Sequence, residues 1–61
     1  MEKDIKRAVT LASEMADIFN ALVRGTQDLD LQRLFKQLEA DVMDIRHKLS
    51  LAIKIISNNT E

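Results

Sequence analysis

Several residue types that stabilise or equip small proteins are missing from this chain. Its 61 residues include no cysteine, no proline, no tryptophan and no tyrosine, with one glycine, one histidine and two phenylalanines. Without cysteine there is no disulfide and no thiolate metal site, and one histidine is too few for a histidine-built site within a single chain. A domain this short buries a small fraction of its surface and usually needs a disulfide, a metal or a partner chain for firm stability. By elimination, we expect another chain to supply that stability.

The chain also lacks a large excess of positive or negative charge, and it lacks long apolar runs. Nine basic and ten acidic residues are mixed along the sequence and leave a net charge of −1, which argues against a general nucleic-acid-binding surface. Residues 1–7 are mostly charged and no apolar segment of a secretory signal follows them. Uninterrupted apolar runs reach three residues at most, far short of a membrane span. We therefore expect a cytoplasmic protein without a membrane-spanning segment.

The stretch from residue 31 to residue 56 shows what the chain does contain. Steps of four and three residues land on an apolar side chain every time, and neither proline nor glycine interrupts them. This pattern is the a/d seam of a long helix. We expect a helix over residues 28–57 and a frayed polar tail at 58–61. The seam residues are predicted to lie in the core or in an oligomer interface: Leu31, Phe35, Leu38, Val42, Ile45, Leu49, Ala52 and Ile56.

Residues 2–24 also indicate a helix, because strong helix formers dominate them. At ~100° per residue, their apolar positions cover close to half of the helix circumference, which is wider than the strip that one neighbour covers. Leu11 and Ile18 lie on one flank of this face, where a second neighbour is needed. The first helix adds five residues to the predicted core or interface: Ile5, Ala12, Met15, Phe19 and Leu22.

A turn at residues 25–27 separates the two helices. We expect Gly25 to take the left-handed conformation that ends many helices, with Thr26 or Asp28 capping the next helix. A connection this short joins antiparallel neighbours. The sequence therefore predicts an all-α fold in which residues 1–61 form one helical hairpin.

This hairpin has more apolar surface than it can hide. Hydrophobic residues make up 46% of the chain, whereas two helices side by side bury only the strip between them. Two hairpins that pair into a four-helix bundle close the core, so we expect a homodimer, with a tetramer or a heteromeric partner left open. The second helix is the longer by about one to two turns, which leaves Ile53, Ile55 and Ile56 beyond the first helix. Ile53 and Ile55 are candidates for docking an unknown protein partner.

Asp44 and His47 form the sharpest candidate for chemistry. A carboxylate and a histidine three residues apart on one helix, with an acidic residue such as Glu14 or Asp17 on a neighbour, is the metal-binding arrangement of ferritin-like bundles. The seam, however, directs Asp44 and His47 toward solvent, so an exposed charge pair is the favoured interpretation. We predict no metal ligand and no cofactor.

A short basic run, Arg46, His47 and Lys48, gives a second candidate site. Small four-helix dimers such as the plasmid copy-number Rop proteins bind RNA through a basic face. Here Asp41 and Asp44 interrupt the patch, and no aromatic side chain is available to stack on a base. A solvated face with pairs such as Asp44–Lys48 is the favoured interpretation.

Some stretches of the chain resemble a known family. Asp4-Ile5-Lys6, Gly25-Thr26-Gln27-Asp28 and Leu34-Phe35-Lys36-Gln37-Leu38, with Asp41, His47 and Leu49, resemble a family of small helical proteins of Gram-positive, spore-forming bacteria, some of them encoded beside sporulation membrane proteins. The resemblance spans residues 4–50. It implies a helical interaction protein from a spore-forming bacterium and supplies no catalytic residue.

No set of residues suited to catalysis stands out. The chain has no Ser/His/Asp or Cys/His set and no glycine-rich phosphate loop, and two short helices offer little concavity for a substrate pocket. We therefore expect no enzyme, but a self-associating helical scaffold or regulator that acts through protein–protein contacts and has a link to sporulation. A nucleic-acid-binding regulator is the alternative, and a metal-binding half of a ferritin-like bundle is the third.

Overall fold

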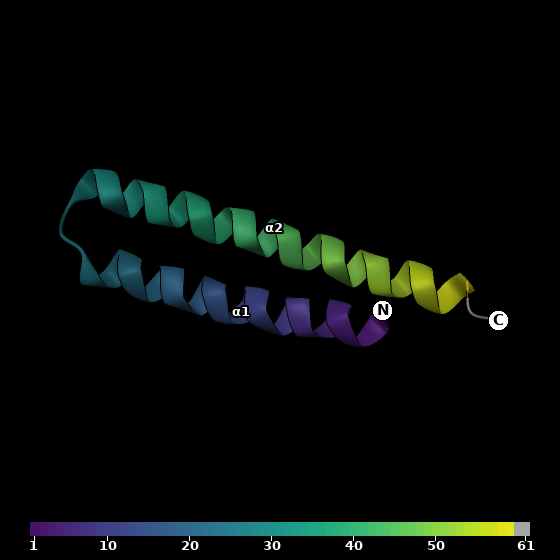
Figure 1. Cartoon of the computed structure of the whole chain (residues 1–61). Coiled ribbons are helices and arrows are strands. Elements are labelled where there is room, and N and C mark those ends of the chain that lie inside the picture. Colours follow the sequence, from purple (N-terminus) through teal and green to yellow (C-terminus); the bar gives the residue numbers. More distant parts are fainter. Residues whose placement is uncertain (60–61) are drawn as a thin grey trace.

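The protein folds as two antiparallel helices joined by a short turn (Figure 1). The structure is a computed structural model and describes residues 1–59. Helix α1 spans Glu2–Gly25 and helix α2 spans Leu29–Asn59, and the Cα atoms extend over 52 × 14 × 11 Å. The all-α helical hairpin predicted from the sequence is confirmed.

The start of α2 is fixed by the side chain of Asp28. Its Oδ1 accepts hydrogen bonds from the backbone N–H groups of Asp30 at 2.9 Å and Leu31 at 3.1 Å. These are two of the N–H groups that a helix start leaves without a partner inside the helix. Thr26 Oγ1 accepts from the N–H of Asp28 at 3.2 Å and so orders the turn before the cap. Of the two capping residues left open by the sequence, Asp28 is the cap of α2.

The turn itself differs from the expectation at Gly25. Gly25 is the last residue of α1 and has no positive φ, so the prediction of a left-handed glycine is wrong. Thr26 leaves the helix in an extended conformation, with φ −108° and ψ 144°. An extended residue directly after the helix redirects the chain, and the turn then needs no left-handed residue.

The far end of α2 also differs from the expectation. Asn58 and Asn59 are helical, so the prediction of a frayed tail from residue 58 is wrong for these two residues, while 60–61 lie outside the described residues. No helix-breaking residue precedes Asn59, and its backbone continues the ladder of the preceding turns. With 31 residues against 24 in α1, α2 runs past the beginning of α1 (Figure 1).

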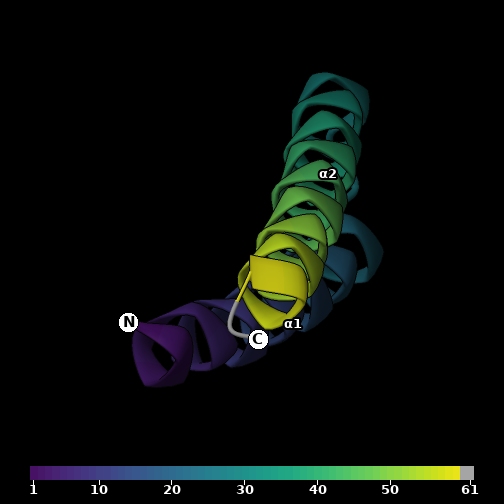
Figure 2. The same ribbon diagram turned by 90° about the vertical axis from the view of Figure 1, so that its right-hand side faces the viewer.

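The core between the helices is small. Among the described residues, Ala12, Ala16 and Val42 are buried, and Phe19 packs against them. No described side chain is completely buried. Viewed from the end, the two helices change their relative position along the hairpin (Figure 2), as expected when a seven-residue repeat keeps one seam in contact. The hairpin therefore has a seam but little interior.

Candidate functional site

Both helices follow one seven-residue repeat, and its a positions form the centre of the interhelical seam. The a residues are seven apart on each helix and all are buried or half-buried. This agrees with the contact expected between helices that pack through a heptad seam. The a positions are Ile5, Ala12 and Phe19 on α1, and Phe35, Val42, Leu49 and Ile56 on α2.

The hairpin covers the flank of the seam that carries the e positions. These residues are buried or half-buried as well: Val9, Ala16 and Val23 on α1, and Gln32, Glu39, Arg46 and Ile53 on α2. Arg46 donates a hydrogen bond from Nη1 to Ser13 Oγ at 3.3 Å. Gln32 Nε2 donates to the carbonyl of Thr26 at 2.8 Å and to that of Val23 at 3.4 Å. The long polar side chains of Gln32, Glu39 and Arg46 thus cover this flank of the seam.

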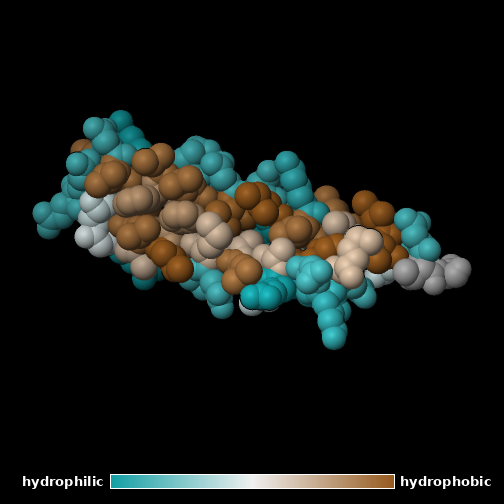
Figure 3. All heavy atoms as spheres, in the orientation of Figure 1, coloured by the Kyte–Doolittle hydropathy of each residue, from teal (hydrophilic) through white to brown (hydrophobic). Residues whose placement is uncertain are grey.

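The opposite flank, at the d and g positions, is left open. Seven large apolar side chains there are between 40 and 58% exposed: Leu11, Met15, Ile18, Leu22, Leu31, Leu34 and Ile45. In an antiparallel pair that contacts through a and e, the d and g positions of both helices lie on the same side of the hairpin. We call these seven residues, with the half-buried Leu38 and Ala52, the open face. Figure 3 shows one side of the hairpin, on which apolar residues of both helices are in view and are densest toward the turn.

The structure therefore divides the predicted core and interface residues into two groups. Met15, Leu22, Leu31 and Ile45 are exposed in the hairpin, so none of them belongs to the intrachain core. The others are buried or half-buried. An apolar stripe this wide has two flanks, and one neighbouring helix covers only one of them.

The predicted core and interface residues leave out the e positions that line the seam, among them Val9, Val23 and Glu39, which are half-buried. Ala16 is buried, and Gln32 and Arg46 are half-buried. A polar side chain was not expected in a seam, yet Gln32, Glu39 and Arg46 recur every seven residues beside apolar a positions. That spacing, with methylene stems able to cover apolar neighbours, is the signal that could have identified them.

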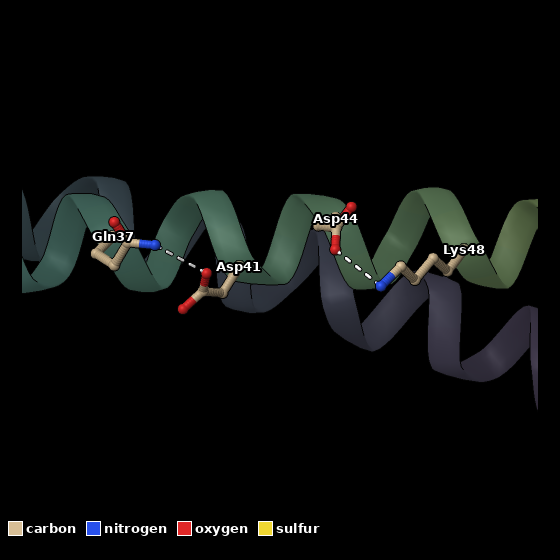
Figure 4. A network of polar contacts seen from close by, with 4 residues as sticks. All are labelled: Gln37, Asp41, Asp44 and Lys48. Atoms are coloured by element: carbon tan, nitrogen blue, oxygen red, sulfur yellow. Dashed lines mark hydrogen bonds and ion pairs between the residues drawn. The ribbon is translucent and has the colours of Figure 1, made fainter.

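Two charged residues lie among the g positions of α2, Asp41 and Lys48. Gln37 Nε2 donates to Asp41 Oδ1 at 3.0 Å, and Lys48 Nζ is 3.2 Å from Asp44 Oδ2, as Figure 4 shows. The Asp44–Lys48 pair predicted from the sequence is confirmed. Both of its side chains are well exposed, so the pair contributes a few tenths of a kcal/mol at most.

The other candidate sites are not brought together. Asp44 and His47 are exposed, as are Glu14 and Asp17, and residues 1–59 contain no cluster of three or more metal-ligating side chains. In the basic run, Arg46 bonds to Ser13 and Lys48 pairs with Asp44. The described part of the chain encloses no pocket. Neither helix is long and apolar enough to cross a bilayer over the residues that the structure describes.

The two candidate docking residues at the end of α2, Ile53 and Ile55, differ in their exposure to solvent. Ile53 and Ile56 are half-buried in the phase of the seam. Ile55 is 60% exposed, at a g position like Leu34. Its phase places it in line with the open face and makes it an extension of that surface.

Comparisons with known proteins add no relative to this picture. No family model, no curated protein and no solved structure matches the chain.

Proposed function

We propose that this protein acts through protein–protein contacts as a small scaffold or regulator, and that its open face binds a second copy to form a homodimeric four-helix bundle. The observation that supports the proposal is the set of seven exposed large apolar side chains at the d and g positions of both helices. Monomeric proteins rarely leave a contiguous apolar patch of more than a few hundred Å² in water. The d and g positions complete the a/e seam to the full stripe that a helix of a four-helix bundle uses.

The dimensions of the hairpin suit a dimer interface. Cα extents of 52 by 14 Å give the face a footprint of roughly 700 Å² per protomer, close to the ~800 Å² per partner of a standard stable interface. The accessible surface of the hairpin is 4952 Å², so a second copy would cover a substantial share of it. A core of two alanines and one valine gives a lone hairpin little stability, which also favours association.

The proposal is tested by measuring mass in solution for the wild-type chain and two glutamate variants. Ile45 on the open face and Leu51 on the outer side of α2 are both exposed, at 52 and 43%. Because neither is in the intrachain core, Ile45→Glu should dissociate the dimer by placing a charge in the interface, and Leu51→Glu should not. Light scattering at micromolar concentration should then show that the wild type and Leu51→Glu are dimers and that Ile45→Glu is a monomer. A wild-type chain that is folded and monomeric would overturn the proposal.

The cellular role within this proposal follows from the resemblance over residues 4–50. It suggests an interaction protein of spore-forming bacteria that holds or regulates other proteins during sporulation. A pull-down from sporulating cells, with Leu51→Glu as bait beside the wild type, identifies the partners. A bound protein that is retained by both baits and lost with Ile45→Glu would show that the bundle is the active form.

A further inference from the structure

Two g positions of α2 at the edge of the open face carry opposite charges. Asp41 and Lys48 are seven residues apart at g positions of α2 and flank Ile45 on either side. Both side chains extend from α2 on a side that does not face α1 (Figure 4). The g positions of two antiparallel helices lie next to each other across their contact. An acid and a base at two g positions therefore match an identical helix that runs in the opposite direction.

Helix α1 shows the same arrangement at the rim of the open face. Arg7 and Glu14 are seven residues apart, exposed, and of opposite sign. The intrachain register places Ala12 and Ala16 beside Val42, with Ser13 bonded to Arg46. The midpoint between Arg7 and Glu14 therefore lies level with the midpoint between Asp41 and Lys48. A single twofold axis across the hairpin at this level therefore brings Arg7 opposite Glu14 of the second copy and Asp41 opposite Lys48 of the second copy.

We infer that two hairpins pack open face to open face with their turns at opposite ends, about a twofold axis that crosses the helices beside Ile45. This inference rests on the proposed self-association and specifies its geometry. Helix α2 then lies antiparallel on α2 of the second copy, and α1 on α1. Each Asp41 meets Lys48 of the second copy, and each Arg7 meets Glu14, so symmetry makes four interchain ion pairs. Lys48 has three N–H donors and can keep its own Asp44 while it binds the second copy.

The apolar residues agree with the same axis. In this register Leu34 of one copy faces Ile55 of the other, Leu38 faces Ala52, and Ile45 faces its own equivalent. Ile55, which is 60% exposed in the hairpin, thereby gains an apolar neighbour. On α1, Met15 faces Ala8 and Leu22 faces Met1. Residues near the turn of one copy thus pack against residues near the opposite end of the other copy. Both ends of α2 then take part in the interface.

A dimer with both turns at the same end fits the charges less well. There α1 lies on α2 of the second copy, so Lys48 comes near Asp4. Asp41, however, comes to lie against Leu11 and Met15 with no cation nearby. A carboxylate that loses water without gaining a counter-charge is strongly unfavourable. The opposite-end arrangement leaves neither Asp41 nor Lys48 in this position, and the carboxylate that it places beside an apolar residue, Asp4 next to Ile18, lies near the exposed beginning of α1.

The distance between the two turns tests this geometry directly. The chain contains no cysteine, so Gln27→Cys, at an exposed turn position, carries a single spin label per copy. At 1.5 Å per helical residue, the inferred dimer separates the two labels by about 50 Å. Turns at the same end lie across one bundle, roughly 10–20 Å apart. A pulsed-EPR distance in that short range, for a chain of dimeric mass, overturns the inference and leaves the proposed function intact; an undimerised, folded chain overturns both.

A charge exchange at residues 41 and 48 tests the ion pairs independently. Asp41→Lys and Lys48→Asp each place like charges opposite one another, so each should weaken the dimer roughly tenfold. The double variant D41K/K48D restores opposite charges only across an antiparallel α2–α2 contact, and its dimer affinity should return to within about threefold of wild type. Lys54→Gln, which removes an exposed cation at an f position on the side of α2 opposite the open face, serves as the control and should change affinity little. A double variant no tighter than the weaker single variant overturns the inference.

Discussion

Arg46 reaches across the hairpin from α2 and donates a hydrogen bond from Nη1 to Ser13 Oγ on α1 at 3.3 Å. The two residues are 33 positions apart in the chain, so their contact reports the register of the helices. It also marks which flank of the seam the hairpin covers. With a polar pair on that flank, the apolar flank at the d and g positions is the one that remains open.

The Arg46–Ser13 contact should be measurable by a double-mutant cycle. Arg46→Ala removes both the hydrogen bond and the methylene stem that covers the seam, so it should lower the free energy of unfolding by about 1 kcal/mol. Ser13→Ala should cost less, because it removes one half-buried hydroxyl and leaves the Arg46 stem in place over the seam. Urea unfolding of both single variants and the double variant, at one protein concentration, should give a coupling of about 0.5 kcal/mol or more. Strict additivity would mean that the bond does not persist in solution.

The side chain of Gln32 should contribute more to stability than a side-chain amide near a turn usually does. Its Nε2 donates to the carbonyls of Thr26 and Val23 and so binds two acceptors at the end of α1. Gln32→Ala should lower stability by about 1 kcal/mol, since helix-end carbonyls lose their partner. The matched control is Gln37→Ala, at an exposed residue of the same type whose side chain bonds to Asp41 within the same helix. Equal effects at the two positions would contradict the role assigned to Gln32.

Gly25 should accept a side chain with a gain in stability. It is the last residue of α1, its φ is not positive, and a Cβ added there would meet nothing within 4 Å. Gly25→Ala should therefore raise the free energy of unfolding by about 0.5–1 kcal/mol, because alanine favours the helix and restricts the unfolded chain. Thermal unfolding followed by circular dichroism provides the measurement. A loss of stability would instead indicate a left-handed Gly25.

The buried alanines of the seam should not tolerate substitution by a larger residue. Ala16 is 7% exposed and sits in the core with Ala12 and Val42. Ala16→Leu should cost about 1–3 kcal/mol, because the added atoms force the helices apart. Ala21→Leu, on the exposed outer side of α1, is the control and should be close to neutral. Similar stabilities for the two variants would mean that the seam is looser than described.

Phe35 and His47 distinguish the inner from the outer side of α2. Phe35 is half-buried at an a position, whereas His47 is exposed. Phe35→Ala should cost about 3 kcal/mol as a large-to-small change in a seam, and His47→Ala should stay within ~0.5 kcal/mol of wild type. Unfolding by urea at fixed protein concentration compares the two variants. A large effect at His47 with a small one at Phe35 would show that the helix phase is wrong.

The sequence by itself determined the elements of this protein and the centre of its seam. Uninterrupted helix formers, one short polar turn and apolar residues at steps of three and four lead to an antiparallel hairpin, and Asp28 was already one of two candidate caps. These features are local, because capping and periodicity depend on residues a few positions apart. The exposure of Asp44 and His47 followed from the same phase.

Only the tertiary structure decided which flank of the seam the hairpin covers. The apolar stripe of each helix is wider than one neighbour, and periodicity does not say on which side that neighbour lies. The path of the turn decides it: Thr26 leaves α1 extended, Gly25 stays helical, and Gln32 ties the start of α2 to the end of α1. As a result, Gln32 and Arg46 lie in the seam, whereas Leu31 and Ile45 face outward. For this reason four of the residues predicted to lie in the core or an interface, Met15, Leu22, Leu31 and Ile45, are exposed in the hairpin.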